Sequence, residues 1–224
     1  MGRVKQPKGN KGSLKWTQVL INEYPSILNK QINKFFNRDL DLPIEWLSPR
    51  ADDDYAEYRD EAFLNLLEIK QTKTKLRNFW PDRGPQWDAL GRDSSTGPYF
   101  LLEAKANIPE LLSECQAKAQ ASLDLIKNSL RETQKNLNCK SHVDWTKGFY
   151  QYANRVAHLY YLRCLNNVEA YLIFVYFLND QTHIPTQKSE WDGATRLQKQ
   201  LMGLSRYKLQ KYIIEVFVDV ENIN

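Results

Sequence analysis

The stretch YFLLEAKA, residues 99–106, decides how the chain folds and where its chemistry lies. Aromatic and aliphatic residues dominate it, which is typical of a strand inside a protein. Because side chains alternate along a strand, Glu103 and Lys105 face the same side of the sheet. Removing a carboxylate and an ammonium from water costs several kcal/mol each, so both need a partner, either each other or a bound ion.

A second strand-like run, residues 86–91, precedes this stretch and carries Asp88. The segment between them, RDSSTGP at residues 92–98, is rich in turn-forming residues and predicts a hairpin. An antiparallel hairpin can bring Asp88 beside Glu103. Since two adjacent carboxylates repel each other, a divalent cation between them is favoured, and hard oxygen ligands suit Mg²⁺ or Mn²⁺.

Such a site has the chemistry needed to hydrolyse a phosphodiester bond. A cation held by Asp88, Glu103 and the backbone carbonyl of Ala104 lowers the pKa of a bound water and neutralises charge on the phosphate. Lys105 can orient or deprotonate that water, and the sequence leaves open whether it is a base or an electrostatic clamp. The structural alternative is an ion pair between Glu103 and Lys105 at a sheet edge.

The rest of the pattern predicts an α/β protein with a mixed central sheet flanked by helices. Expected helices cover residues 55–70, 109–138, 148–165 and 191–201, and expected strands cover residues 170–178 and 212–220. Residues 13–35 have helical periodicity interrupted by Pro25, and residues 39–54 are predicted to be a connector. The tryptophans at three positions are expected in the core: Trp87, Trp145 and Trp191.

A basic segment begins the chain, with five Lys or Arg residues and no acidic residue before Trp16. It is interpreted as a flexible tail over residues 1–12, with an arm that contacts phosphates as the alternative. Residues 13–54 are expected to form a helical extension, and residues 55–224 one compact α/β domain. The sequence leaves the oligomeric state open and is compatible with a homodimer.

Composition argues against several classes of protein. The chain has 224 residues, 42% of them hydrophobic, and a net charge of only +4, which argues against disorder. The longest apolar run, residues 170–178, is too short to span a bilayer, so no membrane partner is expected. Three widely spaced cysteines suit a reducing cytoplasm. P-loop, Rossmann and serine-hydrolase motifs are missing from the sequence.

A strand Asp, a turn and then apolar-apolar-Glu-x-Lys resembles the PD-(D/E)XK nuclease superfamily. The strings GPQWDALG (84–91), LLEAKA (101–106) and YQYANRVAHLYYL (150–162) are also similar to a group of uncharacterised bacterial proteins placed near that superfamily. The resemblance covers about residues 79–220 and implies a restriction-endonuclease-like core, with the order α-β-β-β-α-β. It implies Mg²⁺-dependent cleavage of nucleic acid without fixing which, and we expect DNA ahead of RNA.

Two features depart from the family's pattern. The family's first acid follows a proline, whereas Asp88 follows Trp87. A literal Pro81–Asp82 pair lies in a turn-rich segment, and Asp88 is preferred because a strand holds a ligand more rigidly than a loop. The first core strand has no clear signal and is expected from residues 72–80.

The resemblance also assigns roles to residues on two helices. In the family, the helix before the hairpin often adds a carboxylate to the site. Glu61 is the first choice for that carboxylate and Glu57 the alternative, while a solvated helix face explains either of them equally well. In related nucleases a Gln on the helix beside the sheet lies near the metal, and Gln151 resembles it.

Gln151 belongs to a polar stripe on an otherwise apolar helix, together with Asn154, Arg155 and His158 at helical spacing. Buried polar groups need partners. Arg155 can bind a phosphate with two hydrogen bonds, which makes the stripe a candidate nucleic-acid contact. The other interpretation is a structural network or an ion pair with an acid on the sheet. A catalytically inactive module that binds nucleic acid or a partner is the alternative to a nuclease.

Overall fold

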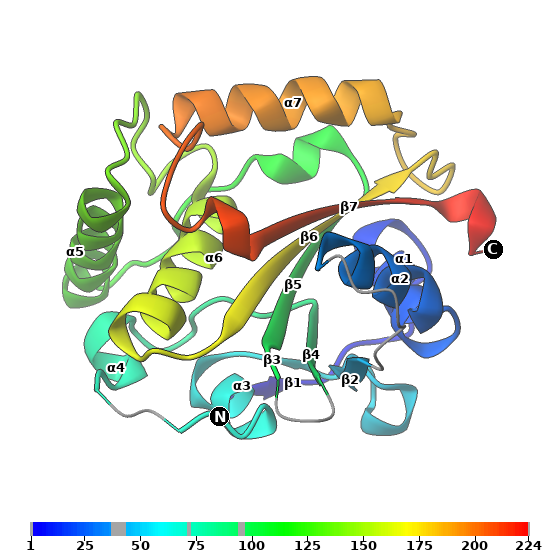
Figure 1. Cartoon of the computed structure of the whole chain (residues 1–224), viewed down its shortest axis with the longest axis horizontal. Coiled ribbons are helices and arrows are strands. Elements are labelled where there is room, and N and C mark those ends of the chain that lie inside the picture. Colours follow the sequence, from blue (N-terminus) through cyan, green and yellow to red (C-terminus); the bar gives the residue numbers. More distant parts are fainter. Residues whose placement is uncertain (1, 37–43, 71–72, 94–96, 224) are drawn as a thin grey trace.

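The computed structural model describes residues 2–36, 44–70, 73–93 and 97–223. A five-stranded mixed sheet with the order β2-β4-β5-β6-β7 forms its centre (Figure 1). β2, β4 and β5 pair antiparallel, whereas β5, β6 and β7 run parallel. The strands are β2 (Ile44–Ser48), β4 (Ala89–Asp93), β5 (Tyr99–Lys105), β6 (Ala170–Leu178) and β7 (Ile213–Asp219). The predicted α/β class with a mixed sheet is confirmed.

Helices cover both faces of this sheet (Figure 1). On one face lie α1 (Gly12–Asn22) and α2 (Pro25–Phe35). The other face carries α3 (Asp60–Leu66), α4 (Leu76–Phe79), α5 (Gln120–Leu137), α6 (Tyr150–Tyr160) and α7 (Lys188–Leu201). α6 continues into a π-helical turn, Tyr161–Leu165, and the described 3₁₀ turns are Ala51–Asp53, Ile108–Leu111, Gln210–Tyr212 and Val220–Asn222.

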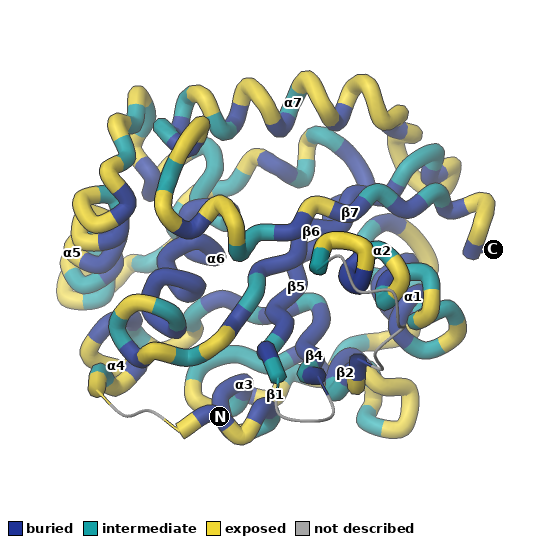
Figure 2. Tube along the Cα trace, viewed as in Figure 1, coloured by how far each residue is buried: buried dark blue, intermediate teal, exposed yellow. Residues whose placement is uncertain are grey.

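The alternation of side chains along β5 places the polar pair on the α6 side of the sheet. Phe100, Leu102 and Ala104 pack with the α1 and α2 core. Glu103 and Lys105 therefore point the other way, toward α6. Figure 2 shows α6 buried along its length between the sheet and α5, which explains why its polar residues must find partners inside the protein.

Several predictions of strands and core are confirmed. Residues 170–178 form β6, a continuous apolar strand covered on both faces. The hairpin is present as β4 and β5, although β4 begins at Ala89 and residues 94–96 of its loop lie outside the described part. The three tryptophans expected in the core are each 2% exposed or less: Trp87, Trp145 and Trp191.

The first core strand comes from a different segment than the sequence predicted. Residues 76–79, inside the range expected to supply it, form the short helix α4. The strand that pairs with β4 is β2, inside the predicted connector 39–54. The described part of that connector therefore contains the edge strand of the sheet. Residues 39–43 of the connector and residue 72 of the expected strand lie outside the described residues. Trp46 is the physical reason, because its ring is 4% exposed and buries against the sheet.

The predicted helix over residues 109–138 is two elements. The 3₁₀ turn Ile108–Leu111 ends near Leu112, and α5 begins only at Gln120. Between them the backbone pairs with another segment, since the Ser113 amide donates to the Gly148 carbonyl at 2.6 Å and the Cys115 amide to the Thr146 carbonyl at 2.9 Å. Tertiary hydrogen bonds here override helical periodicity.

The N-terminal segment is folded onto the domain, which differs from the flexible tail predicted for residues 1–12. β1 (Arg3–Val4) pairs antiparallel with β3 (Glu57–Tyr58). Arg3 forms ion pairs with Asp53 and Asp54. The predicted helix over residues 55–70 is correspondingly shortened to α3, because its first residues form β3.

Gly91 illustrates how closely β2 and β4 approach. A Cβ atom at this position would lie 2.9 Å from Trp46 Cε3 and 3.1 Å from the Glu45 carbonyl oxygen. We expect Gly91→Ala to lower the free energy of unfolding by about 1–3 kcal/mol, measured by urea denaturation. Gly193→Ala in α7 is the control, because a Cβ there meets nothing within 4 Å and should be neutral or stabilising. Equal stability of the Gly91 variant and wild type would contradict this packing.

Candidate active site

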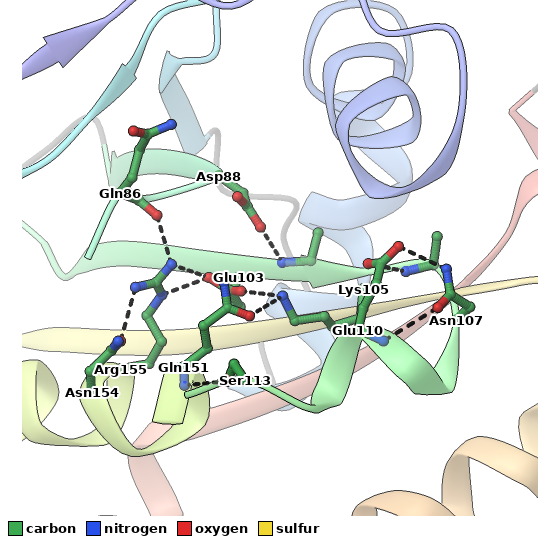
Figure 3. A network of polar contacts seen from close by, with 12 residues as sticks. Gln86, Asp88, Glu103, Lys105, Asn107, Glu110, Ser113, Gln151, Asn154 and Arg155 are labelled. Carbon is green, nitrogen blue, oxygen red and sulfur yellow. Dashed lines mark hydrogen bonds and ion pairs between the residues drawn. The ribbon is translucent and has the colours of Figure 1, made fainter. Parts of the chain in front are cut away.

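A cavity of about 1100 Å³ opens beside α6 and the start of β4. Its walls come from the segment before β4, the chain between β5 and α5, and the first turns of α5 and α6. Six residues predicted to form the site line it: Asp88, Glu103, Lys105, Gln151, Asn154 and Arg155. Figure 3 shows side chains from both halves of the hairpin and from α6 converging, and these residues line the same cavity.

Asp88 lies just before β4, half-buried, with its side chain directed at β5 (Figure 3). Its Oδ2 accepts a hydrogen bond from the Ala104 amide at 2.7 Å. Burial raises the pKa of this carboxyl well above its usual range, and the negative charges of Glu103 and Glu57 raise it further. An extra positive charge at this position would relieve that cost.

Glu103 is 2% exposed and is the centre of the polar network. Its Oε1 accepts a hydrogen bond from Lys105 Nζ, and its Oε2 accepts one from Arg155 Nε at 2.6 Å. Arg155 Nη2 forms an ion pair with the same Oε2. Burial opposes ionisation of Glu103, but Arg155 and Lys105 outweigh it and lower the pKa of the carboxyl. Glu103 is therefore a charged carboxylate held between two cations.

Lys105 is held on the same side by Glu103 and by Gln151 Oε1, which accepts from Nζ at 3.1 Å. Burial disfavours the ammonium, yet Glu103 and Asp88 outweigh it and raise the pKa of Lys105 above its ordinary value. Gln151 is fixed in turn at the start of α6, where its amide donates to Ser113 Oγ at 2.8 Å. Lys105 is thus a charged ammonium that two acceptors fix at the cavity wall.

Arg155 forms an ion pair with an acid on the sheet, which is one of the two roles that the sequence left open. Besides Glu103, its guanidinium donates to the Gln86 carbonyl at 2.6 Å and to Asn154 Oδ1 at 2.9 Å, and it lies 4.7 Å from the centroid of the Trp87 ring. It is an ion-pair partner of an acid on the sheet, 3% exposed. Asn154 also lines the cavity, with 5% of its surface exposed.

The two candidate helix acids are separated by the structure. Glu61 lies on α3 with an exposed side chain and is not among the residues that line the cavity. Glu57 lines the cavity from β3, 7% exposed, where it accepts hydrogen bonds from Gln6 at 3.0 Å and from Gln86. Burial raises the pKa of Glu57, with a further contribution from Glu103. The pairing of β3 with β1 takes Glu57 out of the helix and turns it inward.

The contribution of Gln6 and Gln86 to this site was not found from the sequence. Gln6 comes from the N-terminal segment, 51 residues away from Glu57, and no local pattern marks it. Gln86 contributes twice, through its side chain to Glu57 and its carbonyl to Arg155. The sequence did contain one indication of its role, because Gln86 lies two residues before Asp88 in the stretch GPQWDALG.

His158 does not reach the cavity, which corrects its predicted contact with nucleic acid. It is 1% exposed and packs among aromatic rings, with the Trp80 centroid 4.8 Å away. Its Nδ1 is 2.8 Å from the Asn154 carbonyl oxygen. Burial lowers the pKa of His158 to about 3, so the imidazole is neutral at pH 7. Three of the four stripe residues face the site, and the fourth, one turn further along α6, faces the core.

This burial makes the fold sensitive to acid. The unfolded chain binds a proton on His158 below about pH 6.5, whereas the folded chain does not until about pH 3, so stability falls as the pH drops through this window. Between pH 7 and pH 5, wild type should lose roughly 2 kcal/mol more than His158→Gln, in urea denaturation. The variant of the exposed His142, His142→Gln, should follow wild type. Parallel curves for wild type and His158→Gln would contradict the neutral buried imidazole.

The types of oxygen donor at this site suit a divalent cation, although their side chains are not arranged around one point. Within residues 2–36, 44–70, 73–93 and 97–223, no group of three His, Cys, Asp or Glu side chains is arranged to hold a metal ion. The oxygen donors nevertheless include two carboxylates whose charges disfavour each other, Asp88 and Glu103, with Glu57 nearby. Hard anionic oxygens of this kind are what Mg²⁺ and Mn²⁺ bind.

Comparisons with known proteins identify no relative, so a function can be proposed only from the residues of the site. No protein-family model, no curated protein and no solved structure matches the chain. In the part of the chain that the structure describes, every helix is too short or too polar to cross a membrane.

Proposed function

We propose that the protein is a metal-dependent nuclease with a restriction-endonuclease-like core. The observation that carries this proposal is the joint placement of Asp88, Glu103 and Lys105 on the wall of one cavity, with Gln151 hydrogen-bonded to the lysine. Two carboxylates and an amine beside a cavity are the groups that metal-assisted phosphodiester hydrolysis needs.

The topology supports the same proposal. The order α2, β2, β4, β5, α6, β6 is α-β-β-β-α-β when the intervening β3, α3, α4 and α5 are treated as insertions. Its first three strands pair antiparallel, and a parallel strand follows the helix. This is the order implied by the resemblance to PD-(D/E)XK nucleases, although it starts earlier in the chain than the sequence predicted. Asp88 then stands before the second strand of that order, and the Glu-x-Lys pair lies on the third.

Each residue has a defined task in this mechanism. Asp88, Glu103 and the backbone carbonyl of Ala104 would hold the cation. Glu57 is the further carboxylate on the cavity wall, in place of Glu61. A bound Mg²⁺ or Mn²⁺ supplies charge neutralisation at the phosphate and a water of lowered pKa. Lys105, held by Glu103 and Gln151, orients the attacking water and balances developing charge.

Nucleic acid, with DNA ahead of RNA, is the proposed substrate. Arg83 and Lys118 on the cavity wall supply positive charge for phosphates, independently of the internally paired Arg155. The described cysteines are all free thiols, which supports a reducing compartment, and the cytoplasm is the one we propose.

The test combines cleavage with metal binding. Wild type should cleave plasmid, linear or single-stranded DNA, or RNA, in Mg²⁺ or Mn²⁺, and EDTA should stop it. Asp88→Asn should weaken Mn²⁺ binding at least about tenfold by calorimetry, because it removes one anionic ligand. Asp192→Asn, which changes an exposed carboxylate on α7, is the control and should bind Mn²⁺ as wild type does.

The same variant has a second expected signature. Without metal, Asp88→Asn should be more stable than wild type at pH 7, since burial and the charges of Glu103 and Glu57 disfavour the Asp88 carboxylate. Added Mn²⁺ should raise the Tm of wild type and not that of the variant. Mn²⁺ binding that is equal in both proteins would reject Asp88 as a ligand.

One observation favours a second candidate, a catalytically inactive protein of this fold. Both oxygens of Glu103 already accept hydrogen bonds from Lys105 and Arg155, a pairing that is complete without a cation. This candidate predicts nucleic-acid binding that weakens steeply with salt and no cleavage with any metal.

A further inference from the structure

Behind the ion pair of β5 lies a second, much smaller cavity. It is about the size of one water molecule and is enclosed between β5, β6, α6 and α7. Lys105 and Glu103 form one wall, and Tyr152, Tyr176 and Gln198 contribute to the others. It shares Glu103, Lys105 and Gln151 with the wall of the large cavity and lies on the α6 side of the sheet.

Buried polar atoms without a protein partner gather around this cavity. Among the described residues they include both amide atoms of Gln198 and the hydroxyl group of Tyr176. Both side chains are 1% exposed or less. A buried amide or hydroxyl without a hydrogen bond costs about 1–3 kcal/mol, so such a cluster points to an internal polar ligand.

Lys105 has a hydrogen-bond donor left for the same ligand. Its ammonium carries three donors, and the structure describes two acceptors for them, Glu103 Oε1 and Gln151 Oε1. Tyr176 is the register partner of Lys105 on the neighbouring parallel strand, which puts the hydroxyl-bearing ring on the same face. Gln198 reaches the cavity from α7, and its side-chain amide takes part in no described hydrogen bond.

We propose that this cavity binds an ordered water molecule that joins Gln198 and Tyr176 to Lys105. The water accepts from the lysine, and the amide and hydroxyl satisfy its remaining hydrogen-bonding groups. Gln198 thereby acts as a positioning residue that fixes the lysine from α7. The water site stands on the cavity and the buried atoms alone, while its effect on cleavage rests on the proposed nuclease function.

Stability distinguishes a hydrated cavity from a dry one. If the water is present, Gln198→Leu removes hydrogen bonds that the buried amide makes, and the Tm should fall by about 2–4 °C. If the cavity is dry, the same change removes two unsatisfied polar atoms and the Tm should rise, which would overturn the proposal. Thr195→Val is the control, because Thr195 lies one turn earlier on α7 and bonds to the Trp191 carbonyl.

Tyr176→Phe provides the second variant, since it removes one hydroxyl and keeps the ring. A high-resolution crystal structure of wild type should show a water within hydrogen-bonding distance of Gln198 and Lys105, lost or displaced in Tyr176→Phe. A cavity without water in wild type would overturn the site, whether or not the protein cleaves nucleic acid.

Kinetics test the positioning role separately. In a protein that cleaves, Gln198→Leu should lower kcat about tenfold and leave KM within about twofold, because a misplaced lysine affects the reaction more than substrate binding. Thr195→Val should change neither. An unchanged kcat with the water displaced would reject the positioning role and keep the water site.

Discussion

Glutamine in place of Glu103 is expected to lower the free energy of unfolding by about 3–5 kcal/mol at pH 7. The substitution keeps the size of the side chain and removes the negative charge that Lys105 and Arg155 share. Both cations are then left inside the protein, where burial disfavours ionisation of the two remaining acids, Asp88 and Glu57. Removing one partner from a buried ion pair costs far more than the pair contributes, because the remaining charge stays desolvated.

The exposed pair between Glu215 and Lys199 supplies the control. Its side chains are 29% and 26% exposed, so Glu215→Gln should cost less than about 1 kcal/mol. Urea denaturation with unchanged m values measures both effects. Similar costs for the Glu103 and Glu215 variants would show that the network around Glu103 is solvated in solution.

The pH dependence of this network has a defined sign. The folded-state pKa of Glu103 is lowered, so its stabilising effect is present above its unfolded pKa and is lost as the pH falls through the folded value. His158 destabilises the fold over a higher range, below about pH 6.5. Acid unfolding of wild type should therefore begin with His158 and continue with Glu103.

The strands of the site could be predicted from the sequence because their signals are local. The alternation in residues 99–106 fixes which side Glu103 and Lys105 face. The turn-rich segment before it predicts the β4–β5 hairpin, although Asp88, expected on the first strand, lies one residue before β4. The same holds for β6, whose apolar run has the length of one buried strand. In these cases the pattern and the tertiary contacts favour the same structure.

Other parts depended on contacts between distant segments. Glu57 and Glu61 were both assigned to one helix, with Glu61 as the first choice. In the structure, β1 pairs with Glu57 and Tyr58, so these two residues form a strand instead. β2 was missed because Trp46 is a single large side chain in a segment that otherwise looks like a loop. No window of neighbouring residues contains the information that decides these positions.

The partner of Arg155 could not be predicted from the sequence for a different reason. The sequence placed a buried arginine on α6 and left two partners open, a phosphate or an acid on the sheet. The choice depends on whether a carboxylate oxygen lies within reach, and Glu103 Oε2 is 2.6 Å from Arg155 Nε. Helical spacing gives the direction of a side chain, but the distance across to another element comes only from the packed structure.

Lys105→Met should lower the rate of metal-dependent cleavage by about 10²–10³-fold, the range expected when one group that stabilises developing charge is removed. Methionine retains the length and the apolar stem of lysine and removes the ammonium that Glu103 and Gln151 hold at the cavity wall. Glu103 keeps its pair with Arg155, so the fold and the affinity for Mn²⁺ should be largely retained. The loss should therefore appear in kcat.

Lys199→Met is the matched control, because Lys199 also pairs with a glutamate but lies at the surface of α7, away from the cavity. It should cleave as wild type does. If Lys105→Met binds Mn²⁺, is folded and cleaves at the wild-type rate, the amine has no part in the reaction, and the polar pair on β5 is structural. If wild type itself does not cleave while it binds nucleic acid with a steep salt dependence, the inactive form of the fold is the better account, because the Glu103 pairings then serve stability alone.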